Sequence, residues 1–225
     1  MVVHSLVLAS ASPARLGLLR ATGIDPRVVV SDVDEKAVES AARQRDPQLS
    51  PAQLAQLLAD AKGAVVASHL RDESGGTAAG EADAEQPRWV LACDSVLEVD
   101  GQVHGKPGTP EVARERWQQV RGRSAVLHTG HHLVDLRDGR TAGAPASATV
   151  HFASVTDAEI DGYVATGEPL HVAGGFTLDG LGAPFVESIE GHPSTVIGLC
   201  LPLLRRLLAD LGVDWWQVAS AQSLG

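Results

Sequence analysis

The sequence predicts an α/β fold in which buried strands alternate with helices, and three observations predict it. Two short apolar runs, residues 6–9 and 89–93, have the pattern of strands buried on both faces. A serine or threonine stands directly before Pro13, Pro51 and Pro110, which is typical of a capped helix start. The 225-residue chain is 44% hydrophobic but only 4% aromatic, so it can bury a sizeable core built mainly from valine, leucine and alanine.

The N-terminal part predicts a strand, a short helix, a second strand and a long helix. Ser12 caps the short helix, and Gly23 stands where a helix-ending glycine belongs. Residues 28–30 predict the second strand. The long helix begins after Ser50, and its apolar residues recur at the spacing of one helix face. That face consists of Leu54, Leu57, Leu58, Ala61 and Val65.

A segment without apolar periodicity interrupts the pattern at residues 68–88. It is rich in glycine, alanine and acidic residues and has almost nothing to bury. We therefore predict a flexible insertion in an otherwise single domain of two lobes spanning residues 1–225. The second apolar run follows as a strand with Asp94 at its carboxyl end. Asp100 followed by Gly101 then predicts a type I′ hairpin turn.

The C-terminal part predicts further strands and two more helices. Residues 125–153 have the pattern of two strands joined by a turn at 137–140. A capping box at residues 156–159 opens a short helix. A glycine-rich stretch at 174–198 leads to an amphipathic last helix, which begins near Pro202. The inward face of that helix consists of Leu203, Leu204, Leu207, Leu208 and Leu211.

The acidic composition disfavours two classes of partner. The chain carries 18 basic and 28 acidic residues, and its formal net charge of −10 at pH 7 opposes binding to nucleic acid and to acidic lipid surfaces. Its two cysteines, Cys93 and Cys200, show no CxxC spacing and do not predict a disulfide framework, so a reducing compartment is the default. We find no signal-peptide pattern and no apolar run near the ~20 residues of a transmembrane helix. We therefore expect a cytoplasmic protein that binds neither nucleic acid nor membrane.

The loop after the first strand is a candidate anion site. It lies where ligands usually bind in α/β sheets, between the carboxyl end of a strand and the N-terminus of a helix. Ser10 and Ser12 add hydroxyl groups, and Arg15 adds a guanidinium suited to phosphate. The alternative is that Ser12 only caps the helix, and the local pattern by itself favours this alternative.

Carboxylates follow two of the predicted strands and form a candidate cation site. Asp32, Asp34 and Glu35 follow one strand, and Asp94 follows another. If both strand ends border one crevice, their oxygens suit Mg²⁺, which keeps several water ligands. Each cluster alone is better explained as a solvated acidic turn. Asp94 is the strongest candidate, because a carboxylate at the end of an apolar strand is costly to desolvate without a role or a partner.

Two lysines are candidate counter-charges for phosphate. Lys62 lies at the edge of the apolar face of the long helix, so its stem can be buried while its amine reaches a cleft. Lys106 lies between Gly105 and Pro107 in a tight loop. The alternative for each is an ordinary solvated lysine. The chain contains no P-loop, dinucleotide-binding or nucleophile-elbow motif that would decide the question.

The histidines and Cys93 are weaker candidates. In a strand, His128 and His132 share one face whereas His131 points away, so we do not expect a three-histidine metal site. Cys93 lies in an apolar run beside Asp94. This position favours packing in the core over a role as a nucleophile.

Five sequence blocks together resemble one known family. They occur in order across nearly the whole chain: LASASPAR, SDVDE, LACDSVLEVDGQVHGKP, YVATGEPLHVAGGFTLDGLGAPFVESIEG and STVIGLCLPLL. In this order they resemble the Maf family of nucleotide pyrophosphatases, also called septum-formation-inhibitor-like proteins. No single block is decisive, but five blocks in the right order make a strong match.

The resemblance implies a Maf/ITPase-like fold of two lobes, with a central mixed β-sheet flanked by helices around a cleft. It implies a homodimer that hydrolyses a nucleoside triphosphate to the monophosphate and pyrophosphate with Mg²⁺, Mn²⁺ or Co²⁺. Clearing non-standard nucleotides is one role for such a reaction. By position in the matched blocks, Ser10, Ser12 and Arg15 correspond to substrate-binding residues of the family.

The resemblance also assigns catalytic positions. Asp94 corresponds to the family's catalytic proton acceptor, and Glu35, Lys62 and Lys106 correspond to the other catalytic positions. Glu35 and Asp94 are also the candidate metal ligands. A metal-bound carboxylate loses basicity, so the sequence leaves open whether Asp94 is a base, a metal ligand or both.

The chain departs from the commonest family pattern around the positions that recognise the base. Ala14 stands where the family commonly has the first of two arginines, and Val172 replaces a frequent lysine. Ser95 and Asp179 stand where a branch that prefers dTTP and UTP has threonine and glutamine. We expect Ser95 and Asp179 to bind substrate, but the preferred base stays open.

A second hypothesis comes from a different class of protein. The family name also reflects a role in septum formation, so the chain can be a nucleotide-responsive binding regulator of cell division without significant turnover. Such a regulator need not release pyrophosphate, and an assay of pyrophosphate release therefore separates the two hypotheses.

Overall fold

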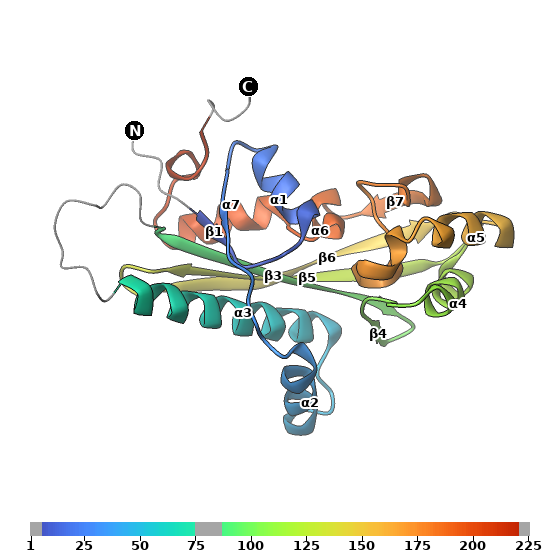
Figure 1. Ribbon diagram of the computed structural model, residues 1–225, viewed down its shortest axis with the longest axis horizontal. Coiled ribbons are helices and arrows are strands. Elements are labelled where there is room, and N and C mark those ends of the chain that lie inside the picture. The colour runs from blue at the N-terminus through green and yellow to red at the C-terminus, as the bar shows by residue number, and fades with distance from the viewer. Residues whose placement is uncertain (1–5, 75–86, 221–225) are drawn as a thin grey trace.

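A seven-stranded mixed sheet forms the centre of the computed structural model, which describes residues 6–74 and 87–220 (Figure 1). The strands are β1 (Leu6–Leu8), β2 (Arg27–Val28), β3 (Trp89–Val99), β4 (Gln102–His104), β5 (Ser124–Asp135), β6 (Thr141–Phe152) and β7 (Val186–Glu190). Their order is β2-β1-β3-β5-β6-β7, and β4 pairs with β3 outside this path. β1 is parallel to β2 and β3, and the other pairs are antiparallel. The predicted α/β class is confirmed.

Helices cover both faces of this sheet. They are α1 (Pro13–Arg20), α2 (Glu35–Arg45), α3 (Pro51–Ser74), α4 (Pro110–Val120), α5 (Asp157–Ala165), α6 (Pro193–Ile197) and α7 (Leu201–Asp210), with 3₁₀ segments η1 (Glu168–His171), η2 (Ala173–Gly175), η3 (Ala183–Phe185) and η4 (Trp215–Gln217). α3 lies along one face, and α1, α6 and α7 lie on the other (Figure 1). α4 and α5 gather at one end of the sheet, and α2 projects from the body (Figure 1). Within the described ranges, no helix is long and apolar enough to cross a membrane.

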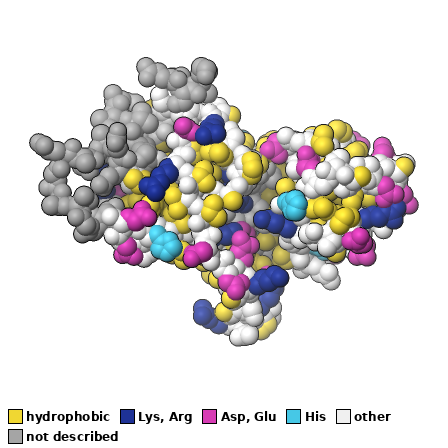
Figure 2. Space-filling view, viewed as in Figure 1, with side chains coloured by type: hydrophobic (Ala, Val, Ile, Leu, Met, Phe, Trp, Pro, Cys, Tyr) yellow, Lys and Arg dark blue, Asp and Glu magenta, His cyan; other side chains and the backbone are white. Residues whose placement is uncertain are grey.

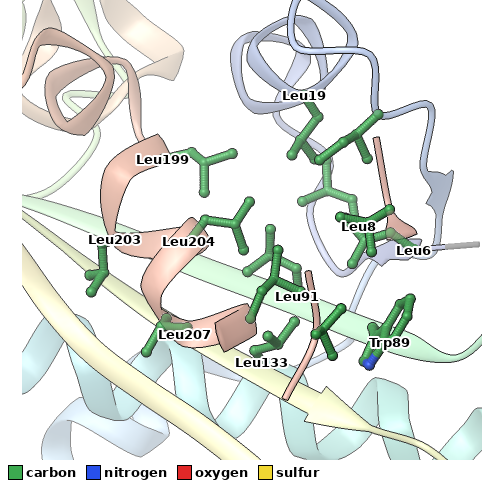
Figure 3. Packing of buried hydrophobic residues seen from close by; sticks show 14 of the residues in the cluster. Leu6, Leu8, Leu19, Trp89, Leu91, Leu133, Leu199, Leu203, Leu204 and Leu207 are labelled. Carbon is green, nitrogen blue, oxygen red and sulfur yellow. The ribbon is translucent and has the colours of Figure 1, made fainter. Parts of the chain in front are cut away.

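The sheet separates two apolar layers in one half of the molecule. Leu91 faces α7, where it packs in a cluster with Leu8, Leu133 and Leu204 (Figure 3). Its neighbour Val90 belongs to the cluster on the opposite face, which includes residues of α3. Successive residues of β3 therefore enter different cores. This is why the sequence of the strand is a continuous apolar run and does not alternate.

The other half of the molecule has an aromatic core between α4 and α5. The ring of Trp117 meets the rings of Phe152, Tyr163 and Phe185 edge to face, with centroid distances of 5.5, 5.4 and 5.7 Å. The indole N–H of Trp117 donates to the Gly175 carbonyl at 2.8 Å. All three phenylalanines and the single tyrosine of the chain lie in this cluster. The phenylalanines and the tyrosine are therefore all in this half, whereas Trp89 and Trp215 pack in the cluster of the other half.

Several local predictions are confirmed. Asp100 and Gly101 both have positive φ, 51° and 77°, as a type I′ turn requires. Thr156 and Glu159 form the predicted capping box at the start of α5. All five leucines predicted for the inward face of the last helix are buried. Burial raises the pKa of the Cys93 thiol to about 12, in keeping with a packing role.

The second apolar strand is longer than predicted. We predicted that it ends before Asp94, but β3 continues to Val99 because β5 pairs with it from Trp89 to Glu98. Asp94 therefore lies inside a strand and not at its end. The neighbouring parallel strand β1 does end there, since Leu8 pairs with Leu91. Asp94 thus lies just beyond the carboxyl end of β1.

The helical region between residues 35 and 74 also differs from the prediction. We predicted no helix at Glu35–Arg45, and α2 buries none of its residues, so it has no apolar stripe that would reveal it. α3 continues through residues 68–74 with Leu70 buried, so these residues belong to the helix and not to the predicted insertion at 68–88. Residues 75–86 lie outside the described residues. Leu57, which we placed on the buried face of α3, is 38% exposed.

Two strands at the margins of the sheet also differ from the prediction. β2 consists of Arg27–Val28, whereas we predicted residues 28–30. β7 lies within the glycine-rich stretch, for which we predicted no strand, and it pairs with the end of β6. Both strands lie at the ends of the sheet order and contain no buried residue. The absence of a buried face explains why β7, with the sequence VESIE, lacks the apolar pattern that would predict a strand.

Candidate active site

The candidate site lies beside a gap in the sheet, next to the middle of β3. β1 pairs with β3 only as far as Leu91, and β4 begins its pairing at Leu97. Asp94 and Ser95 lie between these two points. Because side chains alternate along a strand, Asp94 and Ser95 point to opposite faces of the sheet. Groups from both faces can therefore reach a ligand at this gap.

On the α3 face, one lysine bridges two carboxylates. Lys62 Nζ contacts Asp94 Oδ1 and lies 2.7 Å from Glu35 Oε1. The Lys62 and Asp94 side chains are only 12% and 11% exposed, whereas Glu35 begins α2 and is half exposed. Burial raises the pKa of Asp94, and the charges of Lys62 and Arg15 oppose this rise. Asp94 is therefore a desolvated carboxyl group whose protonation depends on nearby cations.

Close packing of α3 against β5 places Lys62 at this point. At Gly130, a Cβ atom would lie 2.2 Å from the Ala55 carbonyl oxygen, so only glycine permits this approach. Hydrogen bonds also fix the turn of α3 that contains Gln56. The side-chain amide of Gln56 accepts from the His131 backbone N–H at 3.1 Å and donates to the His131 carbonyl at 2.8 Å. Together these contacts set how far α3 lies along the sheet, and hence where Lys62 meets Asp94.

On the other face, Arg15 is a buried cation among neutral oxygens. Arg15 as a whole residue is 9% exposed. Arg15 Nε donates to the Gly198 carbonyl at 2.8 Å, Nη1 donates to Ser10 Oγ at 3.0 Å, and Nη2 donates to Ser95 Oγ at 3.0 Å. Ser12 Oγ accepts from the Arg15 backbone N–H at 3.4 Å, which confirms the helix cap. No ion pair joins Arg15 to a carboxylate elsewhere in the described chain, so its charge is not neutralised there.

The structure does not bring Lys106 and Asp179 into contact with this cluster. Lys106 is exposed in the loop between β4 and α4, and Asp179 is exposed in the loop after η2. Neither side chain makes an ion pair or hydrogen bond with another described residue. The loop of Lys106 is nevertheless fixed, because Arg116 Nη1 donates to the Gly105 carbonyl at 2.5 Å.

A half-buried carboxylate, which sequence reasoning missed, fixes the loop of Asp179. Glu168 accepts hydrogen bonds from Tyr163 Oη at 2.9 Å, from Thr177 Oγ1 at 2.5 Å, and from the backbone N–H groups of residues 181–182 at 3.1 Å. Burial alone would raise the pKa of Glu168, but these hydrogen bonds lower it below its ordinary value. An ionised carboxylate thus orders the loop around Asp179. Its only signal in the sequence was a lone glutamate before a proline.

The three neighbouring histidines contact different partners. His128 Nε2 lies 2.8 Å from Glu98 Oε2, and His132 Nδ1 lies 2.8 Å from Asp60 Oδ1. His131 Nε2 instead accepts from a backbone N–H just before α7, at 2.8 Å. These side chains therefore serve three separate contacts.

The donor set suits a hard divalent cation that keeps other ligands. Glu35 and Asp94 converge on one point, which the Lys62 ammonium takes. Among the described residues, no three His, Cys, Asp or Glu side chains are grouped to hold a metal ion. Two carboxylates are nevertheless enough for Mg²⁺, which commonly takes its remaining ligands from water and phosphate. Figure 2 shows charged side chains of both signs gathered in the hollow between the two halves.

Comparison with known proteins decides the family. The family model described as "Maf-like protein" matches residues 5–211. The chain belongs to the Maf family. This confirms the resemblance found in the five sequence blocks.

Curated Maf relatives are similar over most of the chain. A relative from Salinispora tropica is 56% identical over 208 residues, covering 92% of this chain and 84% of the relative. One from Leifsonia xyli subsp. xyli is 50% identical over 216 residues, covering 95% of each chain. One from Streptomyces coelicolor is 53% identical over 207 residues, covering 92% and 90%. Each of these three relatives carries the name nucleoside triphosphate pyrophosphatase.

Proposed function

We propose that this Maf protein is a nucleoside triphosphate pyrophosphatase, which hydrolyses a (deoxy)nucleoside triphosphate to the monophosphate and pyrophosphate. The observation that carries the proposal is Arg15, a residue that is 9% exposed and whose guanidinium, among the described residues, donates only to neutral oxygens beside the gap. A buried cation without a carboxylate in direct contact is costly, and a polyphosphate supplies negative charge at that point. The names of the relatives support the same activity.

The residues around the gap match what the reaction needs. Attack of water on the α-phosphorus forms one P–O bond and breaks the bond to the β-phosphate, and pyrophosphate leaves. This step depends on positioning and on charge neutralisation. Arg15 binds the phosphates from one face, Lys62 binds them from the other, and Lys106 joins them from its exposed loop. Ser10 and Ser12 add hydrogen bonds to the phosphates.

Asp94 is the group that orients the attacking water and accepts its proton, with Glu35 beside it. Its raised pKa favours this role, because a general base works best when its pKa lies near the working pH. Before substrate binds, the charge of Lys62 lowers the pKa of Asp94 against the effect of burial. Once the ammonium turns to the phosphates, Asp94 becomes more basic at the moment when it must take a proton.

Glu35 and Asp94 would hold a divalent cation, Mg²⁺, Mn²⁺ or Co²⁺. The ion would neutralise phosphate charge and help to orient the triphosphate. Both residues present carboxylate oxygens, which are the ligands that such ions prefer. Of the two, Glu35 is the more adaptable ligand, because it is half exposed at the start of a projecting helix.

A substrate panel tests the proposal. Standard, methylated and oxidised nucleoside triphosphates are incubated with the protein and Mg²⁺, Mn²⁺ or Co²⁺, and release of pyrophosphate is measured. We expect metal-dependent release of pyrophosphate and monophosphate. Binding of nucleotide without release of pyrophosphate from any member of the panel would instead favour the binding regulator.

The recognition of the nucleobase and the oligomeric state of the protein form a second part of the proposal. Ser95 and Asp179 bind the substrate at the positions where the family recognises the base, and Asp179 does so from the loop that Glu168 orders. The protein works as a cytoplasmic homodimer, as the family resemblance implies. Light scattering on the eluted protein measures its mass in solution, and a monomer at working concentrations would contradict the dimer.

A further inference from the structure

Thr129 is a buried polar residue to which the proposed chemistry gives no role. It is fully buried in β5, directly opposite Ser95 of β3 in the strand register. Its hydroxyl oxygen lies 2.9 Å from Ser95 Oγ and donates to the Thr195 carbonyl, also at 2.9 Å. Ser95 Oγ in turn lies 3.0 Å from Arg15 Nη2. Four residues thus form one continuous chain of hydrogen bonds that ends at Arg15.

Counting protons gives this chain a single direction. A carbonyl only accepts, so the one hydroxyl proton of Thr129 is committed to Thr195. Ser95 must then donate its own proton to Thr129. Ser95 is left as an acceptor on its other side, and this is what the guanidinium N–H of Arg15 needs. The order is therefore Arg15 to Ser95 to Thr129 to the Thr195 carbonyl.

One short segment holds both ends of the chain. The Thr195 carbonyl belongs to α6, and the Gly198 carbonyl directly after α6 accepts from Arg15 Nε at 2.8 Å. Gly198 has a φ of 117°, and a Cβ atom there would lie 3.1 Å from Arg15 Nε. The plane of the guanidinium is thus held against α6 on one side and through Ser95 and Thr129 on the other.

We infer that Thr129 is a positioning residue for the phosphates of the substrate, and that it acts through Ser95 on Arg15. The inference rests on the proposed function, because it assigns Arg15 to the triphosphate. Without the Thr129 hydroxyl, the Ser95 proton has no fixed acceptor. The hydroxyl can then rotate, and its oxygen no longer presents a constant lone pair to Arg15. The guanidinium keeps its charge but loses a fixed orientation.

Kinetics of two substitutions at one position test this role. Thr129→Val removes the hydroxyl and keeps the shape, and we expect kcat/KM for pyrophosphate release to fall about five- to tenfold, as expected for one lost buried hydrogen bond. Thr129→Ser keeps the hydroxyl and should restore kcat/KM to within about twofold of the original protein. Equal losses in both variants would mean that packing matters and not the hydroxyl, which overturns the inference.

A matched control and a double variant separate positioning from stability. Thr22→Val removes a hydroxyl that donates to the Leu19 carbonyl at 2.8 Å, at the end of the helix that carries Arg15, and should leave kcat/KM unchanged. In Ser95→Ala protein, adding Thr129→Val should cause no further loss, since the path to Arg15 is already broken. Independent losses that multiply in the double variant would contradict action through Ser95.

A spectroscopic measurement tests the chain without any turnover. In ¹⁵N-labelled protein, hydrogen bonds to both Nη groups of Arg15 slow rotation of the guanidinium, so separate Nη resonances are expected. Thr129→Val should broaden or merge the Nη2 resonances, and Thr129→Ser should keep them. Unchanged Arg15 resonances in Thr129→Val would overturn the inference. A lack of pyrophosphate release by the original protein would instead overturn the proposed function, while the resonances would still test the chain.

Discussion

The two faces of the sheet present different kinds of charge at the gap. On the α3 face, Lys62 contacts the carboxylates of Asp94 and Glu35, so each buried charge already has a partner. On the α6 face, Arg15 donates only to hydroxyl and carbonyl oxygens among the residues that the structure describes. A polyphosphate must displace ion pairs on the first face, whereas on the second it meets a cation that no described carboxylate contacts directly. Under the proposed function, we expect the α6 face to attract the anion and the α3 face to supply the group that reacts.

The sharpest test of the α3 face is Asp94. We expect Asp94→Asn and Asp94→Ala to keep the fold and to lower turnover by about 10²–10⁴-fold, the usual contribution of a general base. Pyrophosphate release measures turnover, and circular dichroism checks the fold. Asp25→Asn, at a surface residue paired with Arg20, serves as the control and should retain activity. Full activity in both Asp94 variants would remove Asp94 from the mechanism.

The corresponding test of the α6 face is Arg15. Loss of a hydrogen-bonded charge to the phosphates should raise KM about 10- to 100-fold in Arg15→Met. Arg15→Lys keeps the charge but not the planar fork, so it should recover only part of the affinity. Arg20→Met is the matched control, because Arg20 lies on the same helix and is exposed. An unchanged KM in Arg15→Met would mean that the anion binds elsewhere.

The pH dependence of the protein's stability tests the buried carboxyl group on the α3 face. Burial raises the pKa of Asp94 in the folded protein above its ordinary value. The stability that the protonated Asp94 contributes is therefore fully present below the ordinary pKa. It is lost as the pH rises through the raised pKa. Asp94→Asn does not titrate. Its Tm relative to the original protein should therefore increase from acidic to neutral pH. Thermal unfolding across pH 4 to 8 measures this difference, and the opposite trend would show that contacts with Lys62 outweigh burial.

Ala14, next to Arg15, is the position at which we expect the smallest effect. Arginine is common there in the family, so Ala14 leaves room beside the Arg15 contact. We expect Ala14→Arg to change relative kcat/KM values among bases by a few-fold, up to about 10-fold, with the overall reaction preserved. The substrate panel measures this profile. An unchanged profile would place base selectivity with Ser95 and the loop of Asp179.

Local patterns in the sequence determined most individual elements. A helix cap, a type I′ turn and a leucine face depend on residues within a few positions of each other, so Asp100 with Gly101, and the leucines of α7, were predicted correctly. Local patterns did not predict α2, which has no buried face. Apolar periodicity reports burial, and a helix that buries nothing has no such pattern.

The order of the five blocks also indicated the family and most of the candidate residues, but not their arrangement. Only the tertiary structure decided that β1 ends beside Asp94 and that Thr129 lies opposite Ser95. Lys62 contacts Asp94, which is 32 positions away in the sequence, and Arg15 contacts the Gly198 carbonyl, which is 183 positions away. Such contacts depend on strand register and on how closely α3 and α6 pack on the sheet. The residues within any one short segment do not contain that information.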